Sequence, residues 1–180
     1  MRKLETGELN RKTIDQFRAA EKIPVIVVLD NIRSMHNVGS VFRTADAFLL
    51  QGIYLCGFTP RPPHRDIHKT ALGATETVEW TYFDRAIDAL DILLAKGYQL
   101  YAVEQVEGSI ALQEFAPARD QKLAVVFGNE ISGVGAEVLS RCTGSIEIPQ
   151  QGMKHSLNIS VAAGIVLWEI CKTRFEYSTT

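Results

Sequence analysis

Residues 146–169 read IEIPQQGMKHSLNISVAAGIVLWE and contain a strand, a loop and a helix in succession. Residues 146–148 are typical of the end of a buried strand, and residues 149–155 form a loop of polar and small residues. From Ser156 onward, apolar residues recur with helical spacing. A loop that leads from a strand into a helix points free backbone N–H groups above the sheet. Because Ser156 and Asn158 stand at this point, we expect a small ligand to bind there.

Strand and helix patterns alternate through the rest of the chain. The apolar run VIVVLD (25–30) predicts a strand that is covered on both faces. VGSVFRTADAFL (38–49) has the apolar spacing of a helix, with Asn37 as its N-cap. KLAVVFG (122–128) predicts another buried strand. The alternation predicts an α/β fold, with a mostly parallel sheet of about six strands and helices on both faces.

Three loops follow predicted strands at one edge of the sheet, at residues 31–37, 128–135 and 149–155. Sheets of this class bind ligands at the carboxyl ends of their strands. We therefore expect the functional site where these loops meet.

The loop GNEISGVG (128–135) has the glycine spacing of a phosphate-binding P-loop. Val134 and Gly135 stand where that motif needs Lys and then Ser or Thr, so the P-loop interpretation fails. No GxGxxG dinucleotide motif follows the first predicted strand either. Gly128, Gly133 and Gly135 could equally serve only to make tight turns.

Two further segments have clear patterns. Residues 84–97 (DRAIDALDILLAKG) predict an amphipathic helix, with Asp84 as its N-cap and Gly97 as its stop. Residues 59–69 (TPRPPHRDIHK) contain three prolines and the densest group of basic residues, which predicts an exposed basic loop.

The chain has 180 residues, which fits one domain at 25–175, with a short N-terminal helical extension (1–24) and a tail (176–180). The formal net charge of −2 argues against a polybasic nucleic-acid-binding protein, although not against a local basic patch. The three cysteines are far apart, which indicates free thiols and no metal site. The chain begins with residues too polar for a signal peptide, and no apolar run is long enough to span a membrane. We therefore expect a cytoplasmic protein with no membrane partner.

Three separate motifs resemble those of the SpoU family of RNA 2′-O-ribose methyltransferases. They are Asn37 with Arg43 six residues later, FGNE at 127–130, and IP followed by SLNIS within 148–160. The resemblance extends from about residue 25 to about residue 170. It implies an α/β fold with a C-terminal trefoil knot, and methyl transfer from S-adenosylmethionine to a ribose 2′-hydroxyl of tRNA or rRNA. It also implies a homodimer in which both subunits build the active site.

The functional residues of the family can be carried over to this sequence by position. The catalytic set falls on five polar residues: Asn37, Arg43, Glu130, Ser156 and Asn158. The S-adenosylmethionine contacts fall on Gly128, Ile148 and Leu157, with Val103 and Met153 as further walls. The resemblance implies that Asn37 and Glu130 organise the loops and that Ser156 and Asn158 shape the site beneath the donor.

The reaction chemistry suggests a role for Arg43. The positive sulfur already activates the methyl group, whereas the acceptor hydroxyl must lose a proton. A guanidinium stays protonated at accessible pH, so we expect Arg43 to hold an RNA phosphate, and the proton to leave to that phosphate or to water. Histidines can exchange a proton near neutral pH. We nevertheless expect His36 and His155, which flank the motifs, to be surface loop residues.

The basic stretch and the C-terminal helix support two further expectations. We expect Arg61, Arg65 and Lys69 to contact RNA phosphates; the alternative is a loop that is only solvated. The helix at 156–170 is apolar around most of its circumference, which predicts one face on the sheet and another against a partner subunit.

Each functional residue also has a purely structural interpretation. Asn37, Ser156 and Asn158 could be helix caps or first-turn residues. Arg43 could form a structural ion pair with Asp46 or with Glu130. Two other functions stay open: a non-catalytic module that binds RNA or senses S-adenosylmethionine, and an α/β enzyme that uses another nucleotide.

Overall fold

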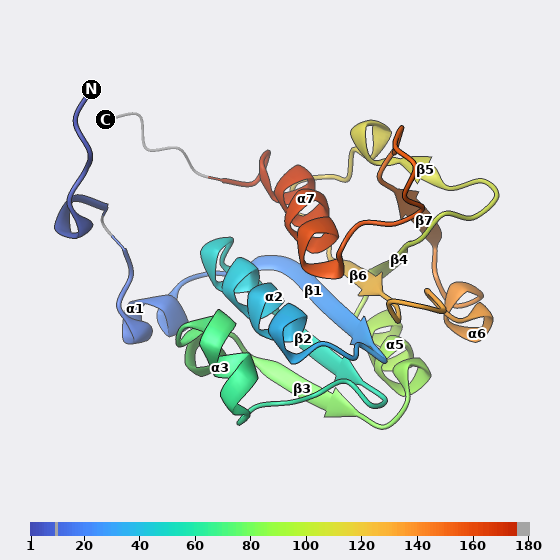
Figure 1. Cartoon of the computed structure of the whole chain (residues 1–180), viewed down its shortest axis with the longest axis horizontal. Coiled ribbons are helices and arrows are strands. Elements are labelled where there is room, and N and C mark those ends of the chain that lie inside the picture. The colour runs from blue at the N-terminus through green and yellow to red at the C-terminus, as the bar shows by residue number, and fades with distance from the viewer. Residues whose placement is uncertain (10, 176–180) are drawn as a thin grey trace.

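A seven-stranded sheet runs through the centre of the structure, and every pair of neighbouring strands is parallel (Figure 1). This computed structural model describes residues 1–9 and 11–175, so the predicted tail at 176–180 lies outside the described residues. The strand order is β3-β2-β1-β6-β4-β7-β5. The strands are β1 (Ile23–Asp30), β2 (Leu50–Cys56), β3 (Trp80–Phe83), β4 (Gln99–Val103), β5 (Ile110–Ala111), β6 (Leu123–Phe127) and β7 (Gly144–Glu147).

The parallel sheet was predicted correctly, and the expected count of about six strands is one too few. The shortest strand, β5, has only two residues. A strand of this length shows no periodicity in the sequence. It is defined by its pairing with β7, where Ile110 lies opposite Ile146.

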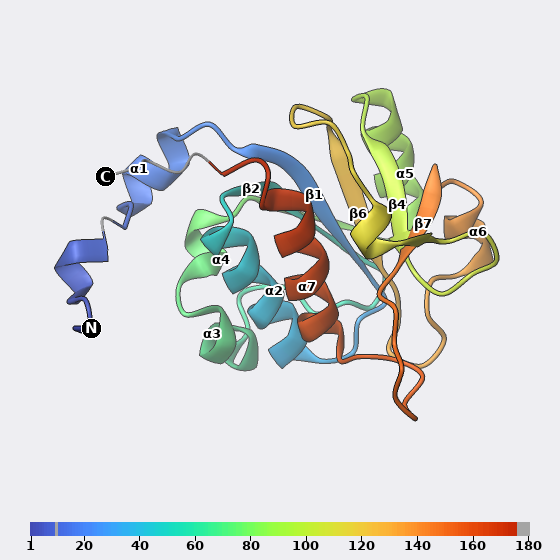
Figure 2. The ribbon, with the colours of Figure 1, turned by 90° about the horizontal axis from the view of Figure 1, so that it is seen from above.

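Helices cover both faces of the sheet, as predicted (Figures 1 and 2). One face carries α1 (Ile14–Ala19), α2 (Met35–Ala47), α3 (Arg65–Ala71), α4 (Ala74–Thr77) and α7 (Ile159–Cys171). The other face carries α5 (Ala86–Ala95) and α6 (Ala136–Leu139). Two short 3₁₀ helices complete the elements, at Thr6–Leu9 and Leu112–Glu114.

The two layers of helices explain the continuous apolar run of β1. Val25, Val27 and Leu29 point into one hydrophobic core, whereas Ile26 and Val28 point into the other. All five side chains are buried. Burying such a side chain contributes about 1.5–3 kcal/mol relative to leaving it exposed, so both faces of β1 stabilise the fold. Among the described residues, no helix is long and apolar enough to cross a membrane.

Two helices begin at other residues than predicted, because other side chains cap them. Helix α2 begins at Met35, and its N-cap is Ser34, whose hydroxyl accepts from the backbone N–H of Asn37 at 3.2 Å. Asn37 is therefore in the first turn and is not the cap. The N-cap of α7 is Asn158, and Ser156 belongs to the preceding loop.

The segment 59–69 is only partly the loop that its prolines predicted. Helix α3 begins at Arg65, after His64 as N-cap, whose ring Nδ1 accepts from the backbone N–H of Asp66 at 3.2 Å. Arg65 and Lys69 therefore project from a helix, and Lys69 forms an ion pair with Asp66.

The predicted stop of α5 is confirmed, but its predicted start is wrong. Gly97 follows the last turn with a φ of +81°, a conformation that favours glycine. The N-cap is Arg85 and not Asp84, and no side chain caps this end of the helix.

Candidate active site

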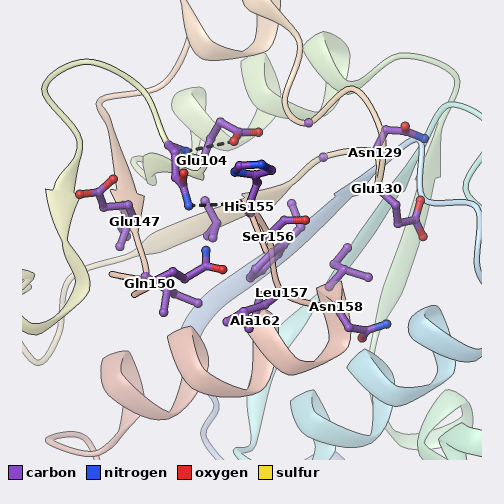
Figure 3. Close-up of a pocket in the computed structure, with 18 of the residues that line it drawn as sticks. Glu104, Asn129, Glu130, Glu147, Gln150, His155, Ser156, Leu157, Asn158 and Ala162 are labelled. Carbon is purple, nitrogen blue, oxygen red and sulfur yellow. Dashed lines mark hydrogen bonds between the residues drawn. The ribbon is translucent and has the colours of Figure 1, made fainter. Parts of the chain in front are cut away.

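The carboxyl ends of β4, β6 and β7 open into a cavity of about 520 Å³ (Figure 3). Its size suits a small-molecule ligand. The loops after these three strands and the start of α7 form its walls. The cavity therefore lies at the sheet edge that the sequence predicted.

Four of the five predicted cofactor residues line this cavity: Val103, Gly128, Ile148 and Leu157. The fifth, Met153, does not line it, and its side chain is 83% exposed. The structure therefore does not bring the side chain of Met153 into the cavity.

Gly128 both makes a tight turn and lines the cavity. The turn is closed by two backbone hydrogen bonds between Asn129 and Gly133, at 3.1 and 2.9 Å. A Cβ atom on Gly128 would lie 2.3 Å from the backbone of Gly133. No larger residue fits there without moving the backbone, so the tight turn and the cavity wall depend on the same glycine.

Glu104 holds the far end of this turn and was not predicted. Its Oε2 accepts from the backbone N–H of Val134 at 2.9 Å, and its side chain lines the cavity. Gly133 has a φ of +66° and gives Glu104 the space it occupies. Glu104 directly follows β4, so its position after a predicted strand at this edge was the available signal.

Glu130 joins the loop after β6 to the start of α2. Its carboxylate accepts from the backbone N–H of Arg33 at 3.0 Å, from that of Ser34 at 3.2 Å, and from the side-chain amide of Asn37 at 3.4 Å. The N-terminus of a helix carries free N–H groups and a partial positive charge, which favour a carboxylate at this position.

These contacts determine the charge of Glu130. Burial raises the pKa of this carboxyl, but the N–H donors of Arg33, Glu130 itself and Ser34, together with the amide of Asn37, outweigh burial. The net effect lowers the pKa of Glu130. Glu130 is therefore an ionised hydrogen-bond acceptor at neutral pH.

A second amide extends this arrangement to α7. The Nδ2 atom of Asn158 donates to Oδ1 of Asn37 at 3.2 Å. Oδ1 of Asn158 accepts from the backbone N–H of Ser160 at 2.9 Å, which caps α7. Glu130, Asn37 and Asn158 therefore form one hydrogen-bonded chain that connects the loop after β6 with the starts of α2 and α7.

The remaining predicted residues differ in their placement. Ser156 lines the cavity, and its hydroxyl makes no hydrogen bond to another described residue. Figure 3 shows Ser156 and His155 between Glu104 on one side and Glu130 on the other. His155 is an exposed loop residue, as expected, and it also lines the cavity. His36 is exposed outside the cavity, but it lies in the first turn of α2 and not in a loop.

Arg43 is exposed on α2 and does not line the cavity. Its side chain forms no ion pair or hydrogen bond with any described residue, so the alternative of a structural ion pair with Asp46 or Glu130 is wrong. Its guanidinium is free to contact a phosphate.

The charges around the cavity restrict what it can bind. Glu104, Glu130 and Glu147 line it, and no described lysine or arginine does. Such a lining opposes a di- or triphosphate and favours a ligand with a positive charge. Among residues 1–9 and 11–175, no group of three His, Cys, Asp or Glu side chains could hold a metal ion.

Comparison with known proteins identifies the family. The sequence matches the SpoU rRNA methylase family over residues 24–168. The chain belongs to this family. The fold of this SpoU chain is accordingly the knotted α/β fold of these methyltransferases, as the resemblance implied.

Individual relatives of this SpoU chain agree with the family. It is 31% identical over 166 residues to a putative TrmH family tRNA/rRNA methyltransferase of Staphylococcus haemolyticus, covering 90% of this chain and 66% of the relative. It is 29% identical over 172 residues to the tRNA (guanosine(18)-2′-O)-methyltransferase of Thermus thermophilus, covering 96% of this chain and 87% of that one.

A solved structure shows the same fold. The crystal structure of an AdoMet-bound rRNA methyltransferase from Sinorhizobium meliloti has a TM-score of 0.79 and 27% identity, covering 89% of this SpoU chain and 61% of that chain. The SpoU chain spans between 42% and 66% of the length of several curated relatives.

Proposed function

We propose that this chain transfers a methyl group from S-adenosylmethionine to a ribose 2′-hydroxyl of tRNA or rRNA. The observation that carries the proposal is the hydrogen-bonded chain of Glu130, Asn37 and Asn158 beside a cavity that suits a cationic ligand. The SpoU family supports the reaction class. The relative from Thermus thermophilus is named for 2′-O-methylation of tRNA, which supports the choice of acceptor.

The cavity lining fits S-adenosylmethionine. When bound, this cofactor supplies a methyl group that its positive sulfur has already activated. Val103, Ile148 and Leu157 offer apolar surface for its adenine ring, and the carboxylates around the cavity favour its positive charge. ATP would bring three phosphates to the same carboxylates, so the lining argues against an enzyme that uses this nucleotide.

The polar residues of the site would position the ribose 2′-hydroxyl that accepts the methyl group, and they need not take its proton. Glu130 is ionised, but several N–H groups occupy its oxygens and lower its pKa, which makes it a weak base. The side-chain amide of Asn37 is held in one orientation by Glu130 and Asn158, so it would present a fixed surface to the ribose. Ser156 contributes a free hydroxyl at the cavity. The proton of the ribose hydroxyl then passes to a phosphate or to water.

Arg43 would hold the RNA, and we place it at the site of a partner subunit. It lies outside the cavity of its own chain, on α2, which packs beside α7 (Figure 1). The outer face of α7 exposes Val161, Ile165 and Trp168, an apolar surface of the kind that two subunits bury. A homodimer through this face would carry Arg43 from one subunit towards the cavity of the other.

Two measurements test the proposed function. Calorimetry is expected to show binding of S-adenosylhomocysteine and none of ATP. Mass spectrometry of RNA nucleosides from cells with and without the gene is expected to show the loss of one 2′-O-methylnucleoside. Binding of S-adenosylhomocysteine without any lost methylnucleoside would point instead to a non-catalytic module that senses the cofactor.

A further inference from the structure

Phe58 is the most exposed aromatic side chain of the described residues. Its side chain is 61% exposed, compared with 49% for Trp168, and the other described aromatic residues are buried or half-buried. Trp168 packs against the rings of Phe48 and Phe175, whereas no described aromatic ring packs against Phe58. A single exposed apolar residue is common at protein surfaces, so exposure alone assigns no role.

The backbone of Phe58 is held rigidly from one side by the loop after β1. Its N–H donates to the side-chain Oδ1 of Asn31 at 3.2 Å. The preceding residue, Gly57, has a φ of +63°, and the Asn31 side chain occupies the space where a Cβ atom of Gly57 would be. This close approach is possible only with glycine at position 57.

Two more side chains fix the loop on either side of Phe58. The hydroxyl of Tyr82 donates to the backbone oxygen of Gly57 at 2.9 Å. Thr59 is buried, and its hydroxyl donates to the backbone oxygen of Leu29 at 3.0 Å. The ring of Phe58 is therefore presented to solvent from an anchored loop, and binding to it would cost little ordering entropy.

Asn31, which holds the backbone of Phe58, also connects this loop to the candidate active site. The backbone oxygen of Asn31 accepts from the side-chain Nδ2 of Asn129 at 2.7 Å, and Asn129 lines the cavity beside Glu130. Phe58 follows β2, and the order β2-β1-β6 puts two strand spacings, about 10 Å, between the ends of β2 and β6. A nucleotide next to the acceptor would reach Phe58.

A cation on the same loop adds a contact for phosphate. The guanidinium of Arg61 lies over the ring of Tyr82, at 4.0 Å from its centroid, and Arg61 is exposed. It forms no ion pair with a described residue. An exposed aromatic ring beside an unpaired arginine is the combination with which proteins bind unpaired nucleotides, the ring by stacking and the cation by charge.

We propose that Phe58 is a stacking platform for an unpaired base next to the methylated nucleotide. This inference rests on the proposed function and names how that site selects its RNA. The ring of Phe58 lies against the base, while Arg61 holds the adjoining phosphate. The enzyme would then require its target in a loop or another unpaired stretch, because a paired base offers no free face.

The test compares Phe58→Ala, Phe58→Leu and Phe58→Trp with Leu94→Ala, an exposed apolar residue of α5 on the other face of the sheet. The probes are total tRNA and total rRNA from cells that lack the gene. Filter binding measures RNA affinity, and transfer from radiolabelled S-adenosylmethionine measures KM and kcat. We expect F58A and F58L to weaken RNA binding by about 5- to 100-fold and F58W to bind like the wild type, within roughly twofold.

Three outcomes would overturn the proposed stacking role of Phe58. One is F58A binding RNA as tightly as the wild type. Another is F58L retaining wild-type affinity, which would mean an apolar contact without stacking. The third is a change in the mass of F58A by light scattering, which would assign Phe58 to a subunit interface.

The affinity for S-adenosylhomocysteine should be equal in all five proteins, because Phe58 does not line the cavity. This measurement confirms that each variant is folded. If the wild type binds RNA but transfers no methyl group, the proposed function fails. The RNA affinities of the Phe58 variants would still decide whether Phe58 stacks on RNA.

Discussion

The amide nitrogen of Asn158 lies 3.2 Å from the amide oxygen of Asn37, a contact between residues 121 positions apart. The amide nitrogen of Asn37 in turn donates to Glu130 at 3.4 Å. With Asn37 in this orientation, its oxygen faces a donor and its nitrogen faces an acceptor. The three family motifs therefore meet as one hydrogen-bonded unit. A substitution in one motif should also alter the hydrogen bonds of the motifs that it contacts.

Replacing Asn37 with alanine should reduce methyl transfer far more than stability. Glu130 and Asn158 each lose one partner but keep others, so we expect the free energy of unfolding to fall by only about 1 kcal/mol. Displacing the groups that orient the acceptor should lower kcat/KM by about 100-fold. Steady-state kinetics with RNA and urea unfolding measure the two effects.

Asn37 does not line the cavity, so N37A should keep its affinity for S-adenosylhomocysteine, which serves as the control. Wild-type kcat/KM in N37A would show that the contacts of Asn37 with Glu130 and Asn158 have no role in the reaction.

The lowered pKa of Glu130 predicts how stability depends on pH. A carboxyl whose pKa is lower in the folded protein than the ordinary value of about 4.3 stabilises the fold above that value. This stabilisation is lost as the pH falls through the folded pKa. Glu130→Gln removes the charge, so the variant should be about 1 kcal/mol less stable near neutral pH, a figure reduced for solvent screening.

The difference between Glu130→Gln and the wild type should disappear as the pH is lowered through the folded pKa of Glu130. Urea unfolding at a series of pH values measures it. Other carboxyls with lowered pKa values, such as Asp66, are present in both proteins and cancel in the comparison. A difference that stayed the same from neutral to acid pH would mean that the charge of Glu130 does not stabilise the fold.

The elements that the sequence predicted well are those whose signal is local. Successive side chains of β1 point alternately into two hydrophobic cores, so residues 25–29 must all be apolar. The start of α2 was misplaced because Ser34 and Asn37 are both good capping residues, and the choice between them depends on where the chain leaves β1. The prolines of 59–69 concealed α3, which begins only at Arg65.

The candidate site was predicted in its location and only partly in its residues. Placing three loops at one edge follows from a parallel sheet and needs no knowledge of strand order. The contact of Glu104 with Val134 does require it, because this pair joins the loops after β4 and β6, which are neighbours in the sheet. Met153 shows the reverse case, since its loop reaches the site while its own side chain points to solvent.

Two glycines of the same loop provide a matched pair for testing the cavity wall. A Cβ atom on Gly128 would lie 2.3 Å from the backbone of Gly133, whereas a Cβ atom on Gly135 would meet nothing within 4 Å. We expect Gly128→Ala to lower the free energy of unfolding by about 1–3 kcal/mol and to weaken binding of S-adenosylhomocysteine.

Gly135→Ala is the control and should match the wild type in both stability and affinity, since its φ of −64° suits alanine. Urea unfolding and calorimetry on the three proteins measure these effects. Equal affinities for G128A and the wild type would show that the turn at Gly128 does not shape the binding cavity.

Two isoleucines test the homodimer. Ile165 on α7 and Ile92 on α5 are each 40% exposed, and they lie in the two opposite layers of helices (Figure 2). A charge placed within a buried apolar interface is costly unless it is paired. We therefore expect Ile165→Asp to convert a dimer into a monomer, as measured by light scattering at micromolar concentration, and Ile92→Asp to leave the mass unchanged.

Because Arg43 is expected to act at the partner's cavity, the I165D monomer should also lose methyl transfer while it keeps its affinity for S-adenosylhomocysteine. A wild-type protein that is already monomeric, or an I165D monomer with full activity, would remove the partner subunit from the proposed reaction.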